Sequence, residues 1–265
     1  MQIDRAKLRI WADGLAALVA AVLPWSTSIT LIAIGLWLVV LLPTLRQEDL
    51  HDTLRHPAAY LPVALFAFAA LGMLWADVSW KERLSGLYPY SRLLLIPVLF
   101  AQFRDSERWR WVAGAFLASC IAVMLVSYVS ILIGNRIGLV FNVPGIPARD
   151  YIAQAGEFTL CALGLLYLAM NYWSERKTVH LLVAVVLALL FLTNVTLIAT
   201  SRTGLVSIPV LFALFAVTQF RLLHTLALLA LVAFVSTVIF FSSTIVQQRI
   251  AGIFTEVKTH RTSPN

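Results

Sequence analysis

Long apolar stretches, interrupted by short charged segments, most strongly limit how this chain can fold. A membrane-spanning helix needs about 20 mostly apolar residues. Of the 265 residues, 60% are hydrophobic and only 12% are charged, whereas a soluble domain carries about 25% charged residues. We therefore predict an all-α fold, a polytopic membrane helical bundle with about nine transmembrane helices. The predicted spans are residues 10–23, 27–43, 58–75, 87–103, 111–133, 151–172, 179–200, 204–220 and 225–241.

Two of these spans are irregular. The first is short, and residues 1–23 could instead form a secretory signal. No small-x-small cleavage site precedes Pro24 and a second apolar stretch follows at once, which favours an uncleaved helix. The fourth span contains Pro89 and Pro97, which we expect to kink it.

Two connecting segments have sequence features of their own. Residues 75–84 mix aromatic and charged side chains, as in a short helix that lies in the membrane interface. Residues 134–149 are rich in glycine and proline, which favours a structured turn over a helix.

The distribution of cations predicts the orientation of the bundle, because Lys and Arg are retained on the cytoplasmic side of a membrane. With a cytoplasmic N-terminus, the inner segments hold slightly more than half of the 20 Lys and Arg residues. Such a weak bias has two interpretations: the orientation differs, or the outer cations are kept because they bind an anion. We predict a bundle over residues 1–241 and the start of a periplasmic loop over residues 242–265.

Composition also argues against several classes of function. The net charge is +7, but its cations are scattered in short loops between apolar stretches, so we predict no nucleic-acid partner. Cys120 and Cys161 lie within apolar stretches and have no CxxC spacing. They predict buried thiols rather than a disulfide framework or a zinc site, and we expect neither a metal nor a cofactor.

Arg202 is the residue that points most directly to a function. A guanidinium does not lose its proton, so at a membrane edge it needs an anion or a water-filled cavity. The alternative is an interfacial anchor that reaches toward headgroup phosphate. Arg202 enters a new helix, whose free N–H groups also favour an anion. Arg92 and Arg149 belong to the same predicted face. Arginines bind phosphate oxygens two at a time, so we predict that the three bind a pyrophosphate.

Asp150, Gln154 and Glu157 are spaced so that they share one face of the sixth predicted span. The carboxylate of Glu157 would lie roughly 10 Å past the helix start. Charged groups at that depth normally face a cavity or a partner, which predicts a polar cavity face. The alternative is that the helix begins late and that the two carboxylates only cap its first turns.

Two motifs and the order of the predicted spans carry a resemblance to a known family. One motif is the Ser-Arg-Thr-Gly turn at residues 201–204, and the other is Trp-Ala-Asp at 75–77 followed by Arg92 before residues 93–97. In these features the sequence resembles the O-antigen ligase and polymerase superfamily of bacterial envelope glycosyltransferases, and the resemblance covers nearly the whole chain.

The resemblance implies a metal-independent transferase in the bacterial inner membrane. A glycan on undecaprenyl pyrophosphate would be moved at the periplasmic face onto a sugar hydroxyl of lipid A-core, with membrane lipids around the bundle. Arg202 would neutralise the leaving pyrophosphate. Family members continue through a large periplasmic loop with a catalytic histidine, and this sequence ends at Asn265. We therefore expect a truncated form, assign no catalytic residue, and leave His260, near the end, unassigned.

Two other functions remain open. An O-antigen or exopolysaccharide polymerase of the same fold would share the donor but use a lipid-linked acceptor. A transporter of an anionic solute would use Arg202, Arg149 and Glu157 along a pathway. Paired broken helices in two related repeats would favour transport, and the sequence contains no such pair.

Overall fold

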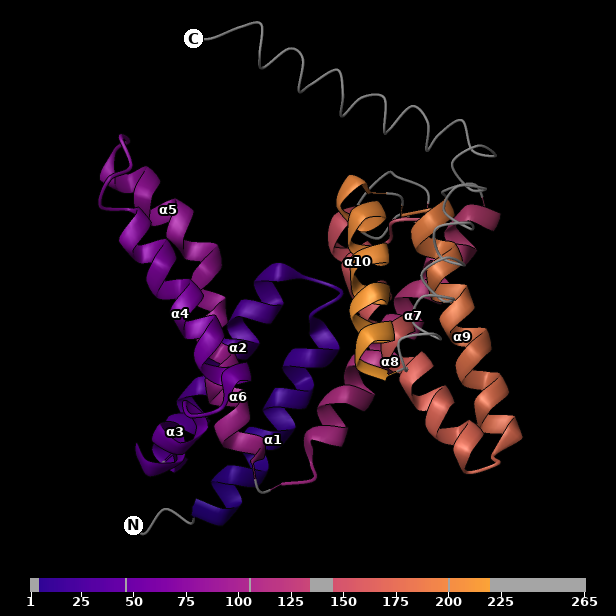
Figure 1. Cartoon of the computed structure of the whole chain (residues 1–265), viewed down its shortest axis with the longest axis horizontal. Coiled ribbons are helices and arrows are strands. Elements are labelled where there is room, and N and C mark those ends of the chain that lie inside the picture. Colours follow the sequence, from indigo (N-terminus) through magenta and orange to yellow (C-terminus); the bar gives the residue numbers. More distant parts are fainter. Residues whose placement is uncertain (1–4, 46, 105, 134–144, 200, 220–265) are drawn as a thin grey trace, which may run out of the picture. The chain divides into compact units, whose positions relative to one another are not determined.

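The computed structural model describes residues 5–45, 47–104, 106–133, 145–199 and 201–219. Every regular element in these ranges is a helix (Figure 1). The all-α prediction is thus confirmed for this part of the chain.

The chain divides into two compact units, each described here by itself. Unit 1 comprises Met1–Leu23 and Thr27–Ala118, and unit 2 comprises Pro24–Ser26 and Ser119–Asn265. Helix α7 (Trp109–Leu132) begins in unit 1 and ends in unit 2.

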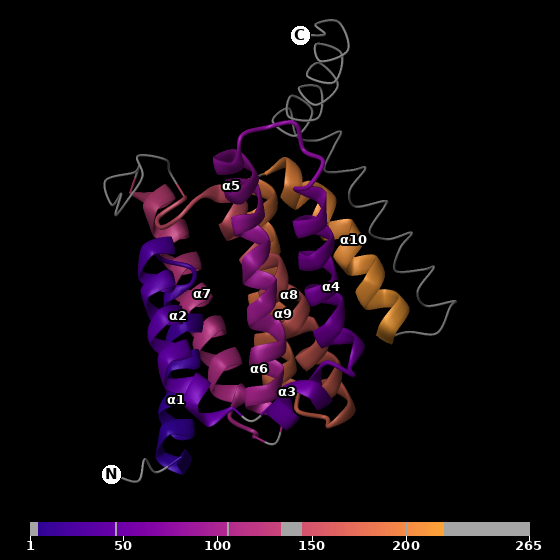
Figure 2. The same ribbon diagram turned by 90° about the vertical axis from the view of Figure 1, so that its left-hand side faces the viewer.

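Unit 1 contains the helices that precede α7 and the start of α7 itself. Small alanines on α1 let Trp37 of α2 pack closely against that helix. Helix α4 packs against both α5 and α6, and α4 and α5 run beside each other in both views (Figure 1, Figure 2). The helices before α7 are α1 (Arg5–Val22), α2 (Thr27–Leu41), η1 (Leu42–Thr44), α3 (Gln47–Thr53), α4 (Pro57–Gly72), α5 (Trp80–Ser91), η2 (Arg92–Leu94) and α6 (Leu95–Phe103).

Unit 2 is organised around the hairpin of α8 (Tyr151–Ser174) and α9 (Thr178–Leu197), which make the most extensive helix contact in the described chain. The rings of Phe158 and Phe191 meet edge to face at 4.9 Å between centroids, a favoured aromatic geometry. Helix α10 (Arg202–Gln219) packs against α8. Because α8 and α9 are antiparallel, the start of α8, the end of α9 and the start of α10 lie at one end of the unit (Figure 1).

Many large apolar side chains lie exposed, among them Leu132 of α7, Trp173 of α8 and Trp75 in the connection after α4. Extensive exposed apolar surface indicates contact with a partner or a membrane, and several of these helices have the length and composition of membrane spans. Within the residues that the structure describes, five segments are long and apolar enough to cross a membrane: Thr27–Thr44, Trp80–Phe103, Trp109–Leu132, Tyr151–Ser174 and Thr178–Leu197.

More of the predicted spans are therefore confirmed as helices than as helices long and apolar enough to cross a membrane. Each of the first eight coincides with a helix or a pair of helices, but only five qualify as spans by length and composition. Helix α1 contains two arginines, a lysine and Asp13 within 18 residues, which lowers its apolar character. The predicted ninth span, at residues 225–241, lies outside the described residues.

The fourth predicted span is interrupted as its prolines suggested. The 3-10 turn η2 (Arg92–Leu94) separates α5 from α6 and lies between Pro89 and Pro97. The separate interfacial helix expected at residues 75–84 is not observed. Instead Ser79 caps α5 with a reciprocal hydrogen bond to Glu82, and the helix then continues through Ser91 because nothing ends it earlier.

The turn between α8 and α9 is polar and exposed. Lys177 Nζ lies 2.7 Å from Glu175 Oε2, and this hydrogen bond raises the pKa of Lys177 above its ordinary value. The pair is solvated, so this end of the hairpin suits an aqueous surface.

Candidate functional site

A short non-helical segment leads into α8 and fixes the geometry of the candidate site. Gly145 has a φ of +81°, in the left-handed region that favours glycine. A Cβ at this position would collide with the side chain of Ile198. Ile146, Pro147 and Ala148 are buried. The described part of the turn that we predict over residues 134–149 is therefore packed into unit 2.

Side chains from two helices satisfy the backbone of Gly145. Its carbonyl oxygen accepts hydrogen bonds from Ser127 Oγ at 2.5 Å and from Gln154 Nε2 at 3.1 Å. Its N–H donates to Ser130 Oγ at 2.9 Å. Backbone groups buried away from water need such partners. The turn is thus held by α7 and α8.

The same network reaches α9 through Asn194. Gln154 Nε2 donates to Asn194 Oδ1 at 2.9 Å, and Asn194 Nδ2 donates to Ser127 Oγ at 2.8 Å. Gln154 is only 4% exposed, and its Oε1 has no hydrogen-bond partner in the described part of the chain. Most buried polar atoms are paired, so this unpaired acceptor stands out within the network.

Arg149 and Glu157 form an ion pair near the start of α8. Arg149 Nη1 lies 3.3 Å from Glu157 Oε1, and the two side chains are 18% and 11% exposed. Each charge thereby compensates the other in a mostly buried place, where an isolated charge would be costly. The pair ties the segment after Gly145 to the second turn of α8.

Asp150 has a different role from Glu157, although the sequence placed them on one face. Its Oδ1 accepts hydrogen bonds from the backbone N–H groups of Ile152 and Ala153, at 2.9 and 2.8 Å. Asp150 is thus the N-cap of α8 and is exposed to solvent. The alternative that the carboxylates cap the first turns of the helix is therefore confirmed for Asp150, whereas Glu157 forms an ion pair with Arg149.

The start of α10 is pressed against α8. Ser201 is buried, and its Oγ accepts a hydrogen bond from the N–H of Gly204 at 2.8 Å. A Cβ at Gly204 would lie 3.2 Å from Ala155 Cβ and 2.7 Å from Ser201 Oγ, so the absence of a side chain allows this close approach. A helix of 18 residues begins here, and the first turn of a helix offers N–H groups that favour an anion.

The three arginines predicted to bind pyrophosphate are divided between the two units, with Arg92 in unit 1 and Arg149 and Arg202 in unit 2. Arg202 is the first residue of α10, while its side chain lies outside the described part. Arg149 belongs to unit 2 and is paired with Glu157. Arg92 belongs to unit 1, where it is exposed and its guanidinium lies 6.0 Å from the centroid of the Tyr88 ring.

The approach of α10 and the ion pair lie on different faces of α8. Ala155, which contacts the start of α10, and Glu157 are two residues apart, which corresponds to roughly 200° around a helix. The candidate site is therefore a rim around the first turns of α8, with the α10 start on one face and the ion pair on another. Gln154 lies between these two faces.

Sequence reasoning missed a second polar cluster, in unit 1. Asp13 is 1% exposed and lies 3.0 Å from Arg108 Nη1. Gln102 Nε2 donates to Asp13 Oδ1 at 2.7 Å, and Trp37 Nε1 donates to Gln102 Oε1 at 2.8 Å. The available signal was an aspartate inside an apolar stretch, since such a residue normally has a partner.

Cys120 and Cys161 are buried, as predicted. Within the described ranges, no group of three or more His, Cys, Asp or Glu side chains could hold a metal ion.

Comparison with models of protein families, with curated proteins and with solved structures found no match to this chain. The fold and the site together define an all-helical protein of membrane type with a polar rim at one end of unit 2. Its function must be inferred from that rim.

Proposed function

We propose that this chain is a membrane glycan transferase of the O-antigen ligase type. It would move a glycan from undecaprenyl pyrophosphate to a sugar hydroxyl of lipid A-core, at the periplasmic face of the bacterial inner membrane. The observation that carries the proposal is the start of α10, where the Ser201 cap and the close contact of Gly204 with α8 place a helix N-terminus in the rim.

The chemistry of this transfer matches a helix N-terminus. A bond forms between the acceptor oxygen and the anomeric carbon while the bond to the diphosphate oxygen breaks, so negative charge gathers on the leaving diphosphate. Oriented N–H groups and a cation stabilise such charge as it develops. In this proposal the first turn of α10 and Arg202 receive the diphosphate.

Other residues of the rim would bind the sugar and hold a second arginine in place for the pyrophosphate. Glu157 holds Arg149 at the same end of unit 2, so we keep Arg149 in the proposed pyrophosphate site, together with Arg92. The unpartnered Oε1 of Gln154 suits a sugar hydroxyl as donor. The proposal also includes nine spans, a cytoplasmic N-terminus and a periplasmic rim.

A transporter of an anionic solute is the competing proposal. The mostly buried ion pair of Arg149 and Glu157 favours it, because charged pairs within membrane bundles often mark solute pathways. A polymerase would differ from the ligase only in its acceptor. Glycan transfer by purified protein, with no change in solute uptake by vesicles, would separate the transferases from the transporter.

Substitution Arg202→Lys in the full-length protein tests the proposed role. Lysine keeps the charge but loses the planar fork, and one lost donor to a developing anion typically costs about 100-fold in rate. We expect glycan transfer to fall at least about tenfold, measured with purified donor and acceptor.

Arg176→Lys, in the turn at the opposite end of the hairpin, is the matched control and should leave transfer unchanged. Both variants should reach the membrane in equal amounts. Unchanged transfer in Arg202→Lys would reject its role, and reporters fused after Thr200 and after Arg176 that place the α10 start in the cytosol would reject the whole proposal.

A further inference from the structure

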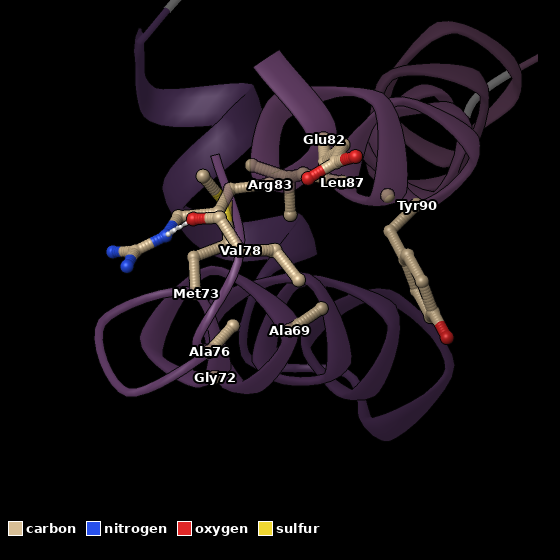
Figure 3. A pocket seen from close by; sticks show the side chains of 10 residues that line it. Ala69, Gly72, Met73, Ala76, Val78, Glu82, Arg83, Leu87 and Tyr90 are labelled. Carbon is tan, nitrogen blue, oxygen red and sulfur yellow. Dashed lines mark hydrogen bonds between the residues drawn. The ribbon is translucent and has the colours of Figure 1, made fainter. Parts of the chain in front are cut away.

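Helices α4 and α5 of unit 1 line an open groove with a volume of about 320 Å³. From α4 and the connection after it come Ala69, Gly72, Met73, Ala76 and Val78, and from α5 come Glu82, Arg83, Gly86, Leu87 and Tyr90. Figure 3 shows these side chains between the two helices. The lining is mostly apolar and small.

The glycines of this groove leave space that no described residue fills. A Cβ at Gly72 or at Gly86 would meet no atom within 4 Å. This differs from Gly204, where a Cβ would meet Ala155 and Ser201. Small residues in membrane helices usually allow close packing, but at Gly72 and Gly86 they leave the groove open.

One face of α5 lines the groove lengthwise. Arg83, Gly86, Leu87 and Tyr90 have the three- and four-residue spacing of a single helix face. Seven residues of helix correspond to roughly 10 Å. A slender apolar chain lying along the helix axis therefore fits the groove better than a compact solute does.

The groove begins at the level where lipid headgroups are expected. The candidate span Trp80–Phe103 starts at Trp80, so Arg83 lies roughly 5 Å inside its end. Trp80 is exposed, as tryptophans at membrane interfaces are. An arginine at this depth extends its guanidinium toward the headgroups.

Arg83 is held with its guanidinium outward. Its Nε donates to the carbonyl oxygen of Val78 at 3.0 Å, and its guanidinium carbon lies 4.7 Å from the centroid of the Trp80 ring. Figure 3 shows its terminal nitrogens pointing away from the lining residues. These nitrogens can bind two oxygens of one phosphate group.

The nearby carboxylates do not neutralise the guanidinium of Arg83, which can therefore bind a phosphate. Glu82 Oε2 accepts hydrogen bonds from Ser79 N and Ser79 Oγ, at 3.0 and 2.9 Å, so its carboxylate serves the cap of α5. Asp77 does not line the groove. Among the described residues, no carboxylate forms an ion pair with Arg83.

We propose that the groove between α4 and α5 binds an anionic phospholipid, with one acyl chain along Gly72 and Gly86 and the phosphate at Arg83. A bilayer lipid is the occupant because an apolar groove beside a span and a phosphate-binding cation at its end match one acyl chain and one headgroup. This site does not depend on the proposed transferase function.

Native mass spectrometry of the full chain in detergent tests the site, with phosphatidylglycerol and phosphatidylcholine added in equal amounts. We expect preferential retention of phosphatidylglycerol. Arg83→Gln should weaken that retention about fivefold. Gly86→Leu, which fills open space, should weaken it about tenfold.

Two matched variants control for charge and for added volume. Lys81→Gln removes a neighbouring cation that does not line the groove, and Gly35→Leu adds the same side chain on α2, where a Cβ also meets no atom within 4 Å. Both should retain phosphatidylglycerol like the unmodified chain. Size-exclusion chromatography shows whether each variant is folded, and Arg83→Gln, at a solvent-facing group, still tests the site if Gly86→Leu does not fold.

Three results would overturn the proposal. One is unchanged retention in Arg83→Gln or in a folded Gly86→Leu variant. Another is equal retention of phosphatidylglycerol and phosphatidylcholine by the unmodified chain. The third is displacement of phosphatidylglycerol by equimolar undecaprenyl phosphate, which would assign the groove to a polyprenyl lipid instead.

Discussion

The two buried polar clusters of this protein differ in how completely they are paired. In unit 1, Gln102 and both carboxylate oxygens of Asp13 have partners. In unit 2, the cluster of Ser127, Gln154 and Asn194 is uncharged, and Gln154 Oε1 is left without a partner among the described residues. One cluster is closed and charged, and the other is neutral and open.

This difference indicates which cluster serves stability and which can serve a ligand. A fully paired buried network rigidifies the helices that it joins, whereas a buried polar atom without a partner needs another explanation. The open cluster also adjoins a non-helical segment and a helix N-terminus. We therefore expect substitutions to have their largest effect on stability in unit 1 and smaller effects in unit 2.

The largest effect is expected for Arg108→Ala. It leaves the buried carboxylate of Asp13 without its cation, and breaking a buried pair costs about 3–5 kcal/mol. Because the Arg108 side chain is 40% exposed, we expect the lower end, about 3 kcal/mol, in reversible unfolding in mixed micelles.

Arg110→Ala is the matched control for that measurement. Arg110 also lies 5.9 Å from a tryptophan ring, as Arg108 does, but its ion pair with Glu107 is long and exposed. Its loss should change the free energy of unfolding by less than about 0.5 kcal/mol. Equal effects of the two variants would remove the distinction between a closed cluster and ordinary surface charge.

An intermediate effect is expected for Gly145→Ala in the turn of unit 2. The positive φ disfavours alanine by about 1–2 kcal/mol, and the added Cβ would collide with Ile198. We expect a loss of about 2 kcal/mol, measured by the same unfolding experiment.

Gly164→Ala, in the interior of α8 with open space at its Cβ, should leave stability unchanged or raise it slightly, because alanine is the better helix former. If both glycines tolerate alanine equally, the turn before α8 is not fixed by Gly145.

The smallest effect is expected for Gln154→Leu. Hydrogen bonds between membrane helices contribute about 0.6 kcal/mol on average, and the carbonyl of Gly145 keeps its bond from Ser127. We expect a loss of about 1 kcal/mol or less, together with a clear loss of glycan transfer if Gln154 binds the sugar.

Thr159→Val offers a buried comparison, because Thr159 donates only to the carbonyl of Ala155 within its own helix. It should leave both stability and transfer nearly unchanged. A loss near 3 kcal/mol in Gln154→Leu would show that the unit 2 cluster is as structural as the one in unit 1.

Much of the helical fold was readable from the sequence, because apolar length and charged interruptions act locally along the chain. Pro89 and Pro97 lie on either side of the interruption of the fourth span, and a proline in a helix interior removes a backbone hydrogen bond. The prediction of a separate interfacial helix at residues 75–84 was wrong, because aromatic and charged side chains also occur at the start of a spanning helix. The Ser79 cap determines where that helix begins.

The site was less predictable, because contacts between distant residues depend on packing. The spacing of Asp150 and Glu157 placed both on one face of α8, but it did not show that Asp150 caps the helix while Glu157 meets Arg149. Likewise, Asp13 and Gln102 are 89 positions apart, and no local pattern connects them. Whether Arg202 binds an anion stays a prediction.

The position of Asn194 late in the chain has a consequence for biogenesis. It lies 40 positions after Gln154 and 67 after Ser127, so the network around the Gly145 turn can close only after the ribosome has produced α9. Until then, the Gln154 amide has no Asn194 oxygen to receive its second N–H. A nascent chain stalled before α9 would therefore expose this polar turn, and we expect cellular quality control to recognise it there.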